Sequence, residues 1–207
     1  MNELLVGALV LSLLHALIPS HWLPFVTIGK AEQWTESRTL GVTALAGLAH
    51  TVSTTLLGLL VGTAGYQLSE NYHDLTERVI PAVLLMLGLW YLMQHLRHGH
   101  HHTHIDASQV RGKSFTTLLL SLCLGMFLSP CIEVETYFLS AGAMGWRALG
   151  MVALLYNVIT LLGMLGMVWL GSRGLKRLNP HWFEHNENLI TGLTLTGLAI
   201  LNFFVEF

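Results

Sequence analysis

Residues 4–28 read LLVGALVLSLLHALIPSHWLPFVTI, an apolar run long enough to cross a bilayer. Near its middle, this run is interrupted by the helix breaker Pro19 and by two histidines, His15 and His21. Ionisable groups at bilayer depth cost at least about 2.5 kcal/mol each on insertion scales, so they usually pair, face a cavity or serve a function. The run therefore predicts a membrane span with a break and a functional site inside it.

The composition of the whole chain indicates a polytopic membrane protein. Hydrophobic residues make up 53% and charged residues 11% of the 207 residues, and the mean hydropathy is +0.58. A soluble domain averages about 25% charged residues, so this chain lacks the polar surface that water requires. The first run has no basic segment before it and suits a first span better than a cleavable signal peptide. The net charge of −2 gives no reason to expect nucleic acid as a partner.

Long apolar runs predict an all-α fold with six transmembrane helices. The runs cover residues 4–28, 40–62, 79–96, 115–146, 148–171 and 189–204. The fourth run is too long for one straight crossing, so we expect a break around Pro130. We expect a single membrane domain over residues 1–207, in which a first half (about 1–96) and a second half (about 114–207) flank a loop at about 97–113.

The two halves resemble each other weakly. An offset of about 110 residues places Pro19-Ser20 of the first span against Pro130-Cys131 of the fourth. Each half has three spans, an odd number, so the halves would be inverted in the membrane. Transporters often use such repeats, with broken helices forming a midplane site. The sequence thus predicts two inverted three-helix repeats with proline-broken first and fourth helices.

The distribution of basic residues orients the predicted bundle. The first, third and fifth loops hold eight of the ten: Lys30, Arg38, Arg97, Arg111, Lys113, Arg173, Lys176 and Arg177. The other side holds Arg78 and Arg147. The positive-inside rule places these three loops in the cytoplasm and both termini outside.

Imidazole groups of the first two spans form a candidate metal site. The break at Pro19 could bring His15 and His21 together, and His50 of the second span would complete a set of three nitrogen ligands. Imidazole suits Zn, Ni, Co, Cu and Fe, and an added carboxylate widens this range toward Mn. The alternative is that each histidine only packs and forms hydrogen bonds.

Three further candidates follow Pro130 in the fourth span: Cys131, Glu133 and Glu135. Residues two apart on a helix point about 200° apart. Either an unwound segment turns both carboxylates inward, or one faces the cavity and the other pairs elsewhere, for instance with Arg147. Cys131 could be a ligand or pack as a small apolar group, and packing is favoured. Its only companion, Cys123, lies in the same run, which argues against a disulfide scaffold.

A histidine-rich segment, HLRHGHHHTH, covers residues 95–104 on the predicted cytoplasmic side. Its histidines are His95, His98, His100, His101, His102 and His104. Such tracts chelate borderline divalent metals weakly and in many geometries. The segment predicts metal capture, with a disordered linker that carries incidental histidines as the alternative.

HALIPSHW (15–22) resembles the first-span signature of the NicO-type nickel/cobalt exporters, within the LysE-like exporter superfamily. GLAHTVSTTLLGLLVG (47–62), the histidine-rich loop and LSPCIEVE (128–135) fit the same family in order. The chain departs from it at Ile18, where the exporters have an acidic residue, and at Ser20, where they have glycine or aspartate. Glu133 and Glu135 stand where neutral residues are expected.

The resemblance implies that His15, His21 and His50 bind a transported ion and that the loop histidines help to capture it. We expect an exporter in a bacterial inner membrane, not an enzyme, with a divalent metal as substrate and no organic cofactor. The expected transported ion is Ni²⁺ or Co²⁺, and Zn²⁺, Fe²⁺ and Mn²⁺ are the alternatives. Protons and lipid are expected partners, and the sequence leaves room for a homo-oligomer. A membrane metalloenzyme is the alternative, whereas a thiol relay is disfavoured because both cysteines lie in one span.

Overall fold

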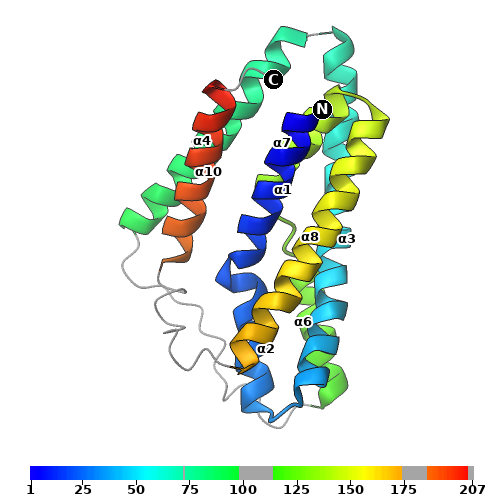
Figure 1. Cartoon of the computed structure of the whole chain (residues 1–207), viewed down its shortest axis with the longest axis vertical. Helices are drawn as coiled ribbons and strands as arrows, with labels where there is room; N and C mark the ends of the chain where they lie inside the picture. Colours follow the sequence, from blue (N-terminus) through cyan, green and yellow to red (C-terminus); the bar gives the residue numbers. More distant parts are fainter. Residues whose placement is uncertain (72, 98–113, 174–185, 205–207) are drawn as a thin grey trace.

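The computed structural model describes residues 1–71, 73–97, 114–173 and 186–204, and every regular element in this part of the chain is a helix (Figure 1). The helices are α1 (Asn2–Leu17), α2 (Pro19–Ala31), α3 (Glu36–Asn71), α4 (His73–Arg97), α6 (Phe115–Phe127), α7 (Ile132–Ala143), α8 (Trp146–Arg173) and α10 (Glu187–Phe204). The all-α prediction is confirmed.

Both predicted helix breaks are present. α1 ends at Leu17, Ile18 is extended, and α2 begins with Pro19 at its first position, where a proline lacks only a hydrogen bond that no helix start can form. α6 ends at Phe127 and α7 begins at Ile132, with the two axes bent by 51°. Irregular backbone therefore interrupts the first and the fourth apolar run.

Three helical segments are long and apolar enough to span a membrane: Leu4–Ala31, Glu36–Gln67 and Trp146–Arg173. The bent pair α6–α7 adds a fourth if it is one broken span. The part of the chain that the structure describes thus supplies three or four candidate spans, which indicates membrane association. The third and sixth predicted spans fall on α4 and α10, which are not among these candidates, so the count of six stays a prediction.

The helices pack so that the two breaks lie side by side. α3 contacts α6, α7 and α8, α1 packs on α8, and α4 pairs with α10 (Figure 1). α3 and α7 approach very closely, because a Cβ added at Gly142 would overlap the backbone carbonyl of Gly62. In Figure 1, α1–α2 runs down the molecule and α6–α7 runs up it. This is the relation that inverted repeats require, although the repeat itself stays a prediction.

Two clusters of buried apolar side chains pack around the α1–α2 and α6–α7 breaks. One joins α1, α7, α8 and α10 around Phe138 and Tyr156, and the other joins α2, α3 and α8 around Phe25 and Met164. Large apolar side chains such as Leu154, 68% exposed, cover the outside, where a bilayer would receive them.

One end of the bundle gathers basic and aromatic side chains. The guanidinium of Arg173, at the end of α8, lies 2.9 Å from the carboxylate of Glu36 at the start of α3. The guanidinium carbon of Arg38 lies 3.9 Å from the ring centre of Phe115 at the start of α6. Basic residues of the first and fifth loops therefore share one end, as the positive-inside assignment requires.

Candidate metal centre

Three buried histidines meet at the break between α1 and α2. His15 lies in the last turn of α1, His21 in the first turn of α2 and His50 on α3. The ring centre of His21 is 4.2 Å from that of His15 and 4.9 Å from that of His50, and the rings of His15 and His50 are 5.9 Å apart. The chain turns at Ile18, which is why two residues six apart can converge. The predicted meeting of the three imidazoles is confirmed.

Cys131 completes a set of four donors. It stands immediately before α7, and its Sγ atom lies 3.4 Å from Nε2 of His21 and 3.4 Å from Nε2 of His50. The four ligand atoms of His15, His21, His50 and Cys131 all lie within 4.8 Å of one another, and all four residues are buried. Cys131 packs within an apolar cluster, and the break before α7 also turns its sulfur toward imidazole nitrogens. This His/Cys cluster can hold a metal ion.

Neighbouring backbone and hydroxyl groups orient the ligands. The Nδ1 atom of His50 lies 3.2 Å from the carbonyl oxygen of Met126, which can only accept, so Nδ1 carries the hydrogen and Nε2 is free for a metal. The backbone N–H of Cys131 donates to Oγ1 of Thr54 over 3.3 Å. Such second contacts fix the direction of ligands in metal sites.

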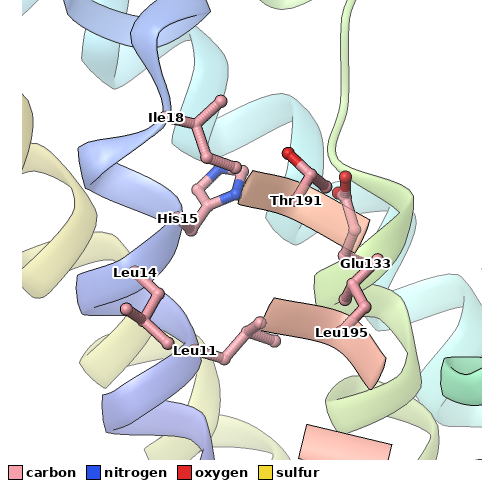
Figure 2. A pocket seen from close by; sticks show the side chains of 7 residues that line it. All are labelled: Leu11, Leu14, His15, Ile18, Glu133, Thr191 and Leu195. Atoms are coloured by element: carbon pink, nitrogen blue, oxygen red, sulfur yellow. The ribbon is translucent and has the colours of Figure 1, made fainter. Parts of the chain in front are cut away.

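One ring nitrogen of His15 is left without a hydrogen-bond partner. Its Nε2 atom is buried and has no hydrogen-bond partner. A buried polar atom without a partner costs about 1–3 kcal/mol, so a bound ion or water would stabilise this arrangement. Figure 2 shows the His15 ring reaching from α1 toward Thr191 of α10 and Glu133 of α7. These residues line a small cavity of about 10 Å³.

A larger cavity of about 300 Å³ adjoins the cluster and provides space through which an ion can reach it. The cluster residues His21, His50 and Cys131 line it. Tyr91 of α4 and Asn188 of α10 also line it. The cluster therefore faces a partly polar space between the core helices and the α4–α10 pair.

The two glutamates have different environments. Glu133 lines both cavities and accepts a hydrogen bond from Tyr91. Glu135 is also buried, but it lines neither cavity, and neither of its carboxylate oxygens has a hydrogen-bond partner. The expected pairing of Glu135 with Arg147 is not formed. One carboxylate faces the cavities, as the second alternative requires, but the other does not pair elsewhere.

Sequence reasoning did not predict the contacts that three residues make in this region: Thr54, Tyr91 and Thr191. The first lies in the Ser/Thr run after His50, and the other two lie on the predicted third and sixth spans. Of the loop histidines, His95 lies in α4, half-buried. His98, His100, His101, His102 and His104 lie outside the described residues.

Comparisons with known proteins found no matching family model, no similar curated protein and no similar solved structure. Function must therefore be inferred from the chemistry of the site itself.

Proposed function

We propose that the protein exports a divalent transition-metal ion across a bacterial inner membrane, with His15, His21, His50 and Cys131 as its binding site. The observation that carries this proposal is the buried four-donor cluster at two adjoining helix breaks. Two stretches of the sequence, HALIPSHW and LSPCIEVE, resemble the NicO-type exporters. This resemblance points to the same function and places Ni²⁺ and Co²⁺ among the ions to be tested.

The placement of the ligands favours transport over a fixed structural metal. They come from α1, α2, α3 and the residue before α7, so a rigid-body shift of one segment changes the distances between donors. Transporters bind ions in this way, at the ends of discontinuous helices near the bilayer midplane. A change in these distances would weaken the site and release the ion.

The number of donors favours transport over catalysis. A catalytic zinc site typically has three protein ligands and an open position for water or substrate. Here four side chains place their donor atoms within 4.8 Å of one another. A metalloenzyme built on the same residues would need one of them to withdraw.

Charge supports binding of a divalent ion and coupling to protons. Glu133 lines the cavity beside the cluster and can compensate the charge of the ion. Metal ligation requires deprotonated donors, so protons compete with the metal. A proton gradient would then drive release on the outer side, while the histidine-rich loop captures the ion on the cytoplasmic side.

The test is transport by the full-length protein in proteoliposomes, with a metal-sensitive dye on the receiving side. Wild type should move at least one of Ni²⁺, Co²⁺, Zn²⁺, Fe²⁺ or Mn²⁺, and His15→Ala and His50→Ala should reduce the rate to that of empty liposomes. His181→Ala, a change in the fifth loop of the sequence, is the matched control and should transport normally. No movement of any of these ions would refute the proposal. A rate indifferent to the pH gradient would remove only the proton coupling.

A further inference from the structure

We propose, building on the proposed function, that Cys131 binds the ion as a thiolate and makes the site prefer Zn²⁺ and Cd²⁺ over Ni²⁺. The starting observation is that one sulfur lies at the same distance, 3.4 Å, from the Nε2 atoms of His21 and His50. Both imidazoles therefore direct nitrogen toward the point that the sulfur also faces.

The two sulfur–nitrogen distances match those between neighbouring ligands of a tetrahedral ion. With Zn–N bonds of about 2.0–2.1 Å and a Zn–S bond of about 2.3 Å, neighbouring sulfur and nitrogen ligands of a tetrahedral ion lie about 3.6 Å apart. The same bonds at right angles, as in square-planar or octahedral complexes, would place them about 3.1 Å apart. The observed 3.4 Å of both sulfur–nitrogen pairs lies closer to the tetrahedral value. Zn²⁺ is almost always tetrahedral in sites closed by four protein ligands.

The donor types point to the same class of ion. A site made only of nitrogen and oxygen donors follows the order in which Ni²⁺ binds more tightly than Co²⁺ or Mn²⁺, whereas thiolates select softer ions and tetrahedral zinc. A sulfur in this position moves the preference away from Ni²⁺.

Charge balance favours a divalent over a monovalent soft ion. A Cys131 thiolate together with an ionised Glu133 carboxylate would place two negative charges beside three neutral imidazoles. A divalent ion neutralises them, whereas Cu⁺ would leave a net negative charge in a buried site, which is costly.

The experiment measures ion affinities of the purified full-length protein by competition with a chromophoric chelator. Wild type should bind one Zn²⁺ or Cd²⁺ per chain more tightly than Ni²⁺. Cys131→Ser should invert that order, changing the ratio of Zn²⁺ to Ni²⁺ affinity by at least about tenfold, or about 1.4 kcal/mol. Cys123→Ser is the matched control, since Cys123 lies half-buried in α6 outside the cluster, and should keep the wild-type order. An unchanged ratio in Cys131→Ser, or tighter binding of Cu⁺ than of Zn²⁺ by wild type, would overturn the inference.

Cobalt absorption provides a second readout if Cys131→Ser does not fold. In Cys123→Ser the only thiol left is that of Cys131. Adding Co²⁺ should then produce a sulfur-to-cobalt charge-transfer band and the intense visible bands of a tetrahedral complex, and their absence would refute thiolate ligation. If proteoliposomes move metal while these bands are missing, only this inference fails. If the bands appear but no metal moves, the proposed transport fails and the thiolate site stands.

Discussion

The Sγ atom of Cys131 lies 3.4 Å from Nε2 of His50, although 81 positions separate the two residues in the chain. α3 makes this contact possible by holding both sides of the α6–α7 break. Its His50 side chain donates to the carbonyl of Met126 before the break, and its Thr54 hydroxyl accepts from the N–H of Cys131 after it. The geometry of the ligands therefore depends on one turn of α3.

Thr54→Val tests this support. The substitution keeps the shape of the side chain but leaves the buried N–H of Cys131 without an acceptor, which costs about 1–3 kcal/mol. Loss of a group that orients a ligand typically lowers metal affinity 10- to 100-fold, so we expect about that loss here. Chelator competition and thermal unfolding in detergent measure the two effects. Thr63→Val, in which the hydroxyl only donates to a carbonyl of its own helix, should change affinity little. Equal affinities for the two variants would contradict the role assigned to Thr54.

Glu133→Gln should weaken binding of a divalent ion, and Glu135→Gln should not. Glu133 lines the cavities next to the cluster, so its negative charge acts on the ion through a poorly screened interior. Glutamine keeps the size and can still accept from Tyr91. We expect at least about a tenfold loss of affinity by calorimetry.

Glu135→Gln serves as the matched control for that loss. Its carboxylate oxygens have no hydrogen-bond partner, and burying an unpaired charged group is costly. The neutral amide should leave metal affinity within about threefold and should not lower the unfolding temperature. Equal losses from the two substitutions would show that the two carboxylates act together on the ion.

The sequence predicted what local signals encode. Prolines and histidines inside apolar runs are visible without a structure, and they located both breaks and the three imidazoles. The direction of Glu133 and Glu135 was not predictable, because it depends on where α7 begins. Since α7 begins at Ile132, Glu133 falls in its first turn and faces the cavities, and the helical angle of about 200° turns Glu135 away.

Roles that depend on contacts between residues far apart in the chain could also not be predicted from the sequence. A hydroxyl within a helix often bonds a carbonyl of the preceding turn, as Thr43 does with Thr39, so nothing in the sequence distinguishes Thr54 as an acceptor for Cys131. In the same way, Cys131 is a small apolar side chain until the fold sets two imidazoles beside it. Tertiary packing decided both roles.

Gly142→Ala should destabilise the contact between α3 and α7. A Cβ at this position would overlap the carbonyl of Gly62, so one backbone must move, at a cost of about 1–3 kcal/mol. Gly150→Ala, in α8, is the matched control because an added Cβ there meets nothing within 4 Å. Alanine favours helix over glycine, so the control should be neutral or slightly stabilising. Unfolding temperatures in detergent check both, and a Gly142→Ala protein as stable as wild type would refute the close approach.

Metal affinity should rise with pH, and the number of protons released should report the thiolate. Metal ligation needs a deprotonated sulfur and neutral imidazoles, so each proton that the ion displaces makes the affinity about tenfold weaker per unit decrease in pH. Near neutral pH we expect about one proton released per Zn²⁺, from the thiol of Cys131, and a steeper dependence in more acidic solution where imidazoles also take up protons. Calorimetry in two buffers of different ionisation enthalpy counts these protons. Cys131→Ser should release about one proton fewer, whereas Cys123→Ser should match wild type. An affinity that stays constant between about pH 6 and pH 8, or equal proton release from the two serine variants, would show that Cys131 does not bind the ion as a thiolate.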